Sequence, residues 1–88
     1  MIDADLGGGV IKQRLARPGA GKSGGYRSIV LFRRGDRAFF VYGFAKSGRD
    51  NISAGELASF RNLARGYLAL SHEQIRTMLG DGKLVEVL

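Results

Sequence analysis

The chain has 88 residues, which fits one small domain near the lower size limit for independent folding. Its hydrophobic content of 44% and charged content of 25% are typical of a globular protein and exclude a disordered chain. The absence of cysteine excludes disulfides, thiol catalysis and Cys-based zinc sites, and a single histidine excludes a His-rich metal site. The formal net charge of +6 favours a polyanionic partner such as RNA, DNA or an anionic membrane surface.

The N-terminal residues and the apolar runs indicate where the chain acts. No apolar run approaches the roughly 20 residues that a membrane span needs, and residues 1–6 do not form a basic stretch followed by an apolar core. We therefore expect no secretory signal and a cytoplasmic location.

The positive charge is concentrated between Val10 and Arg49. This segment holds ten basic residues and one acidic residue, Asp36, whereas the rest of the chain is net acidic. The ten basic residues are Lys12, Arg14, Arg17, Lys22, Arg27, Arg33, Arg34, Arg37, Lys46 and Arg49. A solvated surface would explain such a segment, but ten arginines against four lysines in the chain favour a phosphate-rich partner, because the planar guanidinium matches phosphate geometry.

The first half of the chain reads as strands separated by glycine-rich turns. Gly7–Gly9 marks a boundary, and the alternation from Val10 to Leu15 predicts a strand with Lys12 and Arg14 on one face. Residues 17–25 are rich in glycine and predict a loop. Two apolar, β-branched and aromatic runs then predict a hairpin in the centre of a sheet, with strands at 26–32 and 38–45 and a turn at 34–37.

The second half predicts two helices and a final strand. Ser53 with Glu56, and Ser71 with Gln74, are capping-box pairs that begin helices ending near Leu70 and just before Gly80. Helical spacing places four residues in the core, namely Leu57, Phe60, Tyr67 and Leu68. Residues 83–88 are apolar and β-branched, typical of a strand. The predicted fold is a single α+β domain over residues 1–88, in the order β-β-β-α-α-β, with an antiparallel sheet and the helices on one face.

A loose match to a phosphate-binding loop spans residues 16–23. The motif requires a helix directly after its lysine, Lys22, whereas here Gly24-Gly25-Tyr26 leads into a strand. Nucleotide hydrolysis is therefore disfavoured, but Lys22 and nearby backbone amides remain candidates for phosphate contact.

Several short motifs in a fixed order resemble the RelE/ParE superfamily of bacterial toxins, in particular its HigB-like branch. The matching residues are Lys22-Ser23-Gly24-Gly25-Tyr26-Arg27, then Tyr42-Gly43-Phe44-Ala45-Lys46, then Arg49-Asp50-Asn51-Ile52 leading into a helix with Glu56-Leu57. The resemblance covers nearly the whole chain. It implies a toxin of a type II toxin–antitoxin system that cleaves translated mRNA without a metal or other cofactor, commonly on the ribosome, and that a cognate antitoxin, expected to be a helix-turn-helix protein, neutralises.

The resemblance also implies roles for individual residues. In the family, the arginine of the Gly-Tyr-Arg strand lies in the active site, and this role carries over to Arg27. Arg27 suits stabilisation of the extra negative charge on phosphorus, and Lys22 or Lys46 suits proton transfer. We expect four further cations to guide the RNA backbone, namely Lys12, Arg14, Arg17 and Arg49. His72 is expected to face solvent, and Glu86 to be an edge or antitoxin-facing charge.

Two alternatives remain open at this stage. One is a catalytically inactive, truncated toxin that acts as a module binding RNA or the antitoxin. Family members usually have a strand and one or two helices before the region that begins at Asp3, and we expect this chain to lack them. The same comparison predicts an exposed sheet edge and a homodimer formed through it. The other is a toxin of the gyrase-targeting branch, since the fold is shared and does not decide the target.

Overall fold

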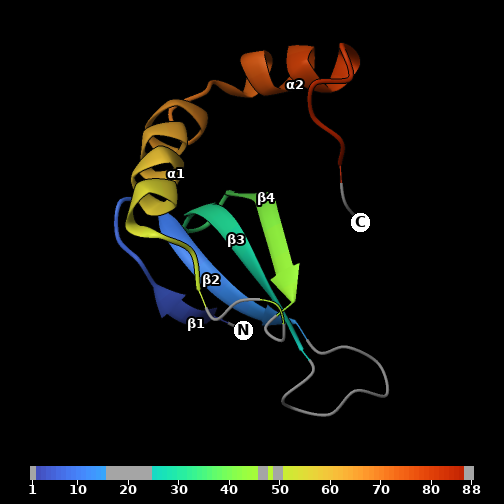
Figure 1. Ribbon diagram of the computed structural model, residues 1–88. Coiled ribbons are helices and arrows are strands. Elements are labelled where there is room, and N and C mark those ends of the chain that lie inside the picture. The colour runs from blue at the N-terminus through green and yellow to red at the C-terminus, as the bar shows by residue number, and fades with distance from the viewer. Residues whose placement is uncertain (1, 16–24, 46–47, 49–50, 87–88) are drawn as a thin grey trace.

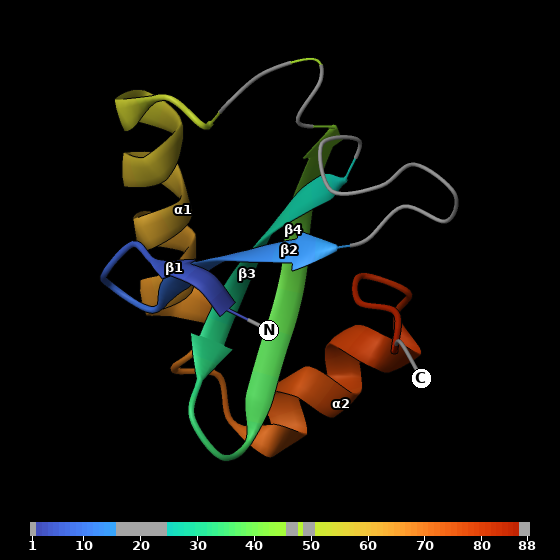
Figure 2. The same ribbon diagram turned by 90° about the horizontal axis from the view of Figure 1, so that it is seen from below.

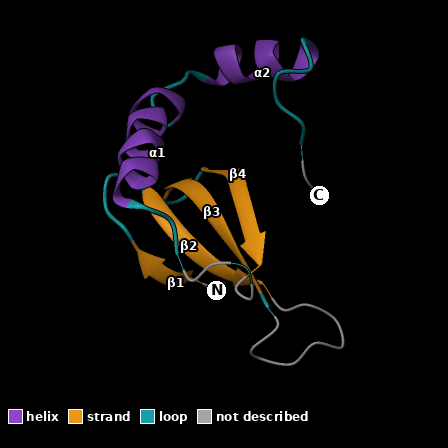
Figure 3. Cartoon of the chain, viewed as in Figure 1, coloured by secondary structure: helices purple, strands orange, loops and turns teal. Residues whose placement is uncertain are grey.

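The computed structural model describes residues 2–15, 25–45, 48 and 51–86. Within these ranges four strands precede two helices: β1 (Ile2–Asp5), β2 (Val10–Leu15), β3 (Tyr26–Arg33), β4 (Arg37–Ala45), α1 (Ala54–Tyr67) and α2 (His72–Gly80). The strands form one antiparallel sheet in the order β1-β2-β3-β4, so sequential strands are neighbours (Figures 1 and 3). The predicted α+β class is confirmed.

The N-terminal hairpin was only partly predicted. The glycine boundary is confirmed as the turn between β2 and β1, a strand that the sequence analysis did not anticipate. Gly9 adopts a φ of +84°, and a Cβ built on it would lie 2.5 Å from Cδ1 of Leu68. The turn therefore favours glycine for its backbone conformation, and a Cβ at this position would also displace the end of the Leu68 side chain.

The predicted hairpin of β3 and β4 is confirmed, but its central position holds for β3 alone. β3 pairs with β2 on one side and with β4 on the other, whereas β4 is an edge strand. The prediction was wrong for β4 because apolar residues on both faces of a strand do not reveal how many strands flank it. The register shifts between Ile29 and Val30, which leaves Val41 as an extra residue in β4.

Both helices begin where the capping pairs predict. Ser53 accepts a hydrogen bond from the backbone N–H of Glu56, whose carboxylate accepts one from the N–H of Ser53, and Ser71 and Gln74 repeat this arrangement. α1 ends at Tyr67, earlier than predicted, and Leu68 is its C-cap. α2 ends at Gly80, at least one residue later than predicted.

The core lies between α1 and one face of the sheet, mainly against β2 and β3. Figure 2 shows the sheet from the side opposite α1, and within the described residues neither helix covers that side. The buried members of the core between α1 and the sheet are Val10, Ile29, Leu31, Phe44 and Ala64. The four predicted core residues, Leu57, Phe60, Tyr67 and Leu68, are partly buried and pack against this cluster.

The C-terminal part of the chain departs from the prediction. α2 buries no residue fully, and residues 83–86 form no strand; residues 87 and 88 lie outside the described ranges. The apolar pattern of this segment satisfies the requirement for a strand, but a strand also needs a neighbouring strand, and the backbone N–H groups of Lys83 and Leu84 donate instead to the carbonyl of Met78 at the end of α2. Both views place α2 and this segment beside β4, on the side away from β3 (Figures 1 and 2).

Candidate nucleic-acid interface

The register of β2 and β3 brings three predicted site residues onto one face of the sheet. Arg14 is paired with Arg27, and Lys12 is paired with Ile29. Residues directly opposite in an antiparallel pair share a face. Ile29 belongs to the core under α1, so Lys12, Arg14 and Arg27 lie on the α1 side of the sheet. We call these three residues the basic row.

The two arginines form a like-charge cross-strand pair. The register places them directly opposite each other across β2 and β3. Arg14 is exposed and Lys12 is half-buried, so the row continues from solvent toward the core. Three cationic side chains thus lie in one row along this face.

Arg27 differs from Arg14 in its burial. Only 5% of its surface is exposed, and its Nη1 donates to the carbonyl of Tyr26 at 3.4 Å. A guanidinium in such an environment acts through a lower effective dielectric than one in water, so its attraction for an anion at short range is stronger.

Aromatic side chains border the basic row on β4. Phe44 is paired with Arg27 and Tyr42 with Ile29, which places both rings on the same face as the row. The Tyr42 ring lies 6.0 Å from those of Phe44 and Phe60, measured between centroids. Tyr42 is 38% exposed, whereas Phe44 is buried. Tyr42 and Phe60 thus connect the row to the packed surface of α1.

The remaining predicted site residues are not placed. Lys22, Arg17, Lys46 and Arg49 lie outside the described residues, as does the loop resembling a phosphate-binding motif. The structure therefore brings together Lys12, Arg14 and Arg27 only.

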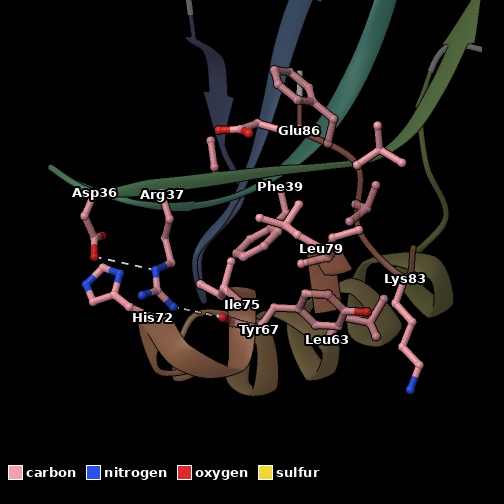
Figure 4. Close-up of a pocket in the computed structure, with 15 residues that line it drawn as sticks. Asp36, Arg37, Phe39, Leu63, Tyr67, His72, Ile75, Leu79, Lys83 and Glu86 are labelled. Atoms are coloured by element: carbon pink, nitrogen blue, oxygen red, sulfur yellow. Dashed lines mark hydrogen bonds and ion pairs between the residues drawn. The ribbon is translucent and has the colours of Figure 1, made fainter. Parts of the chain in front are cut away.

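Two arginines of the basic segment serve the fold. Arg33 Nη1 donates to the carbonyl of Leu68 at 2.6 Å, and Arg37 Nη1 donates to that of Leu70 at 2.6 Å and that of Tyr67 at 3.3 Å. Arg33 and Arg37 both pair with Asp36 (Figure 4 shows the Asp36–Arg37 contact). The hydrogen bond from Arg33 lowers the pKa of the Asp36 carboxyl to about 2. This structural role of Arg33 and Arg37 was not predicted. The sequence signal that could have indicated it is the position of both arginines beside a turn, within reach of a helix end.

A second concave feature lies away from the basic row. A groove with a volume of ≈ 790 Å³ separates β4 and α1 from α2 and residues 83–86 (Figure 4). Its walls include Phe39, Val41, Tyr67, Ile75 and Leu79, so it is mainly apolar. Both His72 and Glu86 lie on its lining and are exposed, which confirms the expected exposure of His72.

Comparison with known proteins identifies the family. The family model of the RelE toxin of the RelE/RelB toxin–antitoxin system matches residues 1–87. No curated protein and no solved structure matches the chain. In the described part of the chain, neither helix is long and apolar enough to cross a membrane. The match spans nearly the whole sequence, and the chain therefore belongs to the RelE toxin family of toxin–antitoxin systems.

Proposed function

We propose that this RelE-family toxin is a metal-independent endoribonuclease of the HigB-like branch that cleaves translated mRNA in the cytoplasm and so inhibits translation. The observation that carries the proposal is the basic row, because the register of β2 and β3 gathers three cations on one face of a chain with a net charge of +6. RelE-family toxins are generally ribonucleases, and a row of cations is the arrangement that an RNA backbone requires.

The proposed chemistry uses the RNA itself as nucleophile. The 2′-oxygen of a ribose loses its proton and attacks the adjacent phosphorus, the bond from phosphorus to the 5′-oxygen breaks, and the leaving oxygen takes up a proton. The products are a 2′,3′-cyclic phosphate and a 5′-hydroxyl. Arg27 stabilises the charge that develops on the phosphoryl oxygens, while Arg14 and Lys12 hold the neighbouring phosphates. Lys22 and Lys46 are the proposed proton-transfer groups, and Arg17 and Arg49 extend the backbone contacts.

Family membership also implies a protein partner. The toxin is held inactive by an antitoxin of the RelB type or a helix-turn-helix protein, and the ribosome presents its substrate. Binding of mRNA in a fixed conformation on the ribosome supplies positioning that the three placed cations alone do not.

The test is induction of the chain in growing bacteria, followed by mapping of new 5′ ends in a well-translated mRNA. The parent is expected to produce cuts within the coding region, and Arg27→Ala to reduce them at least 100-fold, because one lost charge-stabilising donor costs about 10²–10³ in rate. Arg76→Ala, which removes an exposed arginine of α2, is the matched control and is expected to cleave like the parent. Purified protein is expected to keep its activity in EDTA.

Three results would contradict the proposal. Cuts that persist in Arg27→Ala would remove Arg27 from the site. An absence of cuts with soluble parent protein would favour a binding module without catalysis. Induction of the DNA-damage response without mRNA cleavage would favour a gyrase-targeting toxin.

A further inference from the structure

Three aromatic side chains are exposed in the described part of the chain, and one of them shares a face with the basic row. Tyr26 is 41% exposed, Phe40 57% and Tyr42 38%. Successive residues of a strand face opposite sides of a sheet, so Tyr26, which precedes Arg27 in β3, lies on the side away from α1. Phe40 is paired with Val30, an odd number of residues from Arg27, and so lies on that side too. Tyr42 alone combines an exposed ring with the basic face.

Tyr42 lies diagonally across the sheet from Arg27. The register pairs Arg27 with Phe44 and Ile29 with Tyr42, so Tyr42 is two residues from the position opposite Arg27. Diagonal neighbours of this kind are about 7–8 Å apart, within reach of aromatic and long side chains. A nucleobase is joined to its phosphate through a ribose. A nucleotide whose phosphate contacts Arg27 therefore brings its base toward the ring of Tyr42.

The ring of Tyr42 is supported by two other rings. Its centroid lies 6.0 Å from those of Phe44 and Phe60, with interplanar angles of 33° and 36°. Phe44 belongs to the buried core and Phe60 is partly buried against it, so Tyr42 is the exposed member of this cluster. A ring packed in this way has little conformational freedom to lose when a ligand stacks on it, which lowers the entropic cost of binding.

An exposed ring beside cations matches the chemistry of single-stranded RNA. The cations attract the phosphates, and an aromatic side chain stacks on the bases, because every base has a π-face. An acidic peptide would use the cations and leave the ring without a partner. An apolar ligand would use the ring and remove water from Arg14 and Arg27 without supplying an anion, which is costly. The combination therefore favours a nucleotide over both of these ligands.

We propose that Tyr42 is a base-positioning residue, whose ring stacks on the nucleobase of the nucleotide that has its phosphate at Arg27. Stacking fixes the ribose relative to Arg27 and so holds the RNA in one alignment on the basic row. The ring performs this role, and the hydroxyl of Tyr42 takes no part in proton transfer. This inference rests on the proposed function in one respect, the RNA ligand, and it does not depend on cleavage.

The test is a double-mutant cycle between Tyr42 and the bases of the RNA. One ligand is a 2′-O-methylated oligoadenylate, which the proposed reaction does not cleave, and the other is an oligomer of the same length and backbone whose nucleotides are all abasic. Tyr42→Leu is expected to weaken binding of the oligoadenylate at least fivefold and to change binding of the abasic oligomer less than twofold. Tyr26→Leu, which removes a similarly exposed ring from the other side of the sheet, is the matched control and is expected to stay within twofold of the parent for both ligands.

A tryptophan substitution tests stacking by spectroscopy. The chain contains no tryptophan, so Tyr42→Trp introduces a single indole emitter. Its emission is expected to fall at least about twofold on addition of the oligoadenylate and to stay constant with the abasic oligomer. Tyr26→Trp is expected to keep its emission with both ligands. Tyr42→Phe, which retains the ring without the hydroxyl, is expected to bind the oligoadenylate within twofold of the parent.

Three results would overturn the inference. Equal losses of affinity for the two ligands in Tyr42→Leu would assign Tyr42 to the folding of the sheet. A loss of affinity in Tyr42→Phe as large as that in Tyr42→Leu would assign binding to the hydroxyl. A parent that does not bind the oligoadenylate would exclude base stacking at Tyr42. A parent that gives the expected binding results and does not cleave mRNA would overturn the proposed nuclease and leave this inference intact.

Discussion

Gly9 shows how one residue ties the N-terminal hairpin to the helical layer. Its positive φ excludes most side chains, and its Cα faces Leu68, the C-cap of α1. Beside it, Arg61 of α1 donates to the carbonyl of Leu6. The turn between β1 and β2 is therefore a packing contact with α1 and not only a chain reversal.

Gly9→Ala is expected to lower the free energy of unfolding by at least about 2 kcal/mol, because a left-handed conformation costs about 1–2 kcal/mol and the clash with Leu68 adds to it. Gly35→Ala is the matched control. Gly35 has a φ of +93° but no atom within 4 Å of a built Cβ, so it reports the conformational cost alone. Chemical denaturation of both variants measures the difference, and equal losses would contradict the contact with Leu68.

Asp36 provides a prediction of pH dependence. The hydrogen bond from Arg33 holds the pKa of Asp36 at about 2 in the folded chain, below its ordinary value of 3.8. A carboxyl whose pKa is lowered by folding stabilises the fold above its unfolded pKa and loses this contribution as the pH falls through the folded pKa. We expect the Tm difference between the parent and Asp36→Asn to be constant above about pH 5 and to shrink between about pH 4 and pH 2. A difference that does not change over this range would show that the ion pair does not form.

At the scale of elements, the hairpin of β3 and β4 is fixed to the end of α1 by its arginines. The last carbonyls of a helix have no partner within it and carry the negative end of its dipole. Arg33 and Arg37 supply donors to the carbonyl of Tyr67, the last helical residue, to that of the C-cap Leu68, and to that of Leu70 beyond the helix. This contact sets the angle at which the chain leaves α1 and enters α2, and so it also sets one wall of the groove.

Arg37→Met keeps the aliphatic part of the side chain and removes the donors. The side chain of Arg37 is only 6% exposed, so its loss removes the side-chain donor to the Leu70 carbonyl and one of the two arginines that pair with Asp36. We expect a loss of about 2–3 kcal/mol in the free energy of unfolding. Arg34→Met, at the exposed neighbouring turn position, is expected to change it by less than about 0.5 kcal/mol. Similar effects of the two substitutions, measured by urea denaturation, would show that Arg37 does not hold the end of α1.

At the scale of the whole molecule, the sheet offers two separate surfaces. The basic row lies on the α1 side of β2 and β3, and the groove lies beside the edge of β4. Arg33 and Arg37 are engaged in hydrogen bonds and ion pairs within the fold. The net charge of the chain therefore overstates the positive charge that is available to RNA. The basic row contributes three further cationic side chains on the α1 side of the sheet.

The salt dependence of RNA binding tests whether the cations of the basic row, and not the net charge alone, attract RNA. For a single-stranded RNA that cannot be cleaved because its riboses are 2′-O-methylated, Arg14→Gln is expected to reduce the slope of log K against log salt by about 0.7. Arg76→Gln removes the same formal charge from α2 and is expected to leave the slope unchanged. Fluorescence anisotropy at several salt concentrations measures both slopes, and an equal reduction in the two variants would mean that RNA is attracted only by net charge.

The local features of the fold were predictable from the sequence. The capping pairs at Ser53 and Ser71 each join residues three apart, so they are fully specified by neighbouring residues. The alternation in β2 likewise predicted that Lys12 and Arg14 share a face. Their approach to Arg27 was not predictable, because it depends on the register between strands that are joined through a long connection.

Sequence alone thus determined the class of the fold, the ends of most elements, the family and the sign of the charge, since each follows from local patterns or from composition. Tertiary structure decided which cations share the α1 face of the sheet and which bind the end of α1, because both groups have the same side-chain chemistry and differ only in what lies opposite them. It also decided that β4 is an edge and that residues 83–86 are not a strand. Strand pairing depends on two segments of the chain, and the sequence of one segment does not identify the segment with which it pairs.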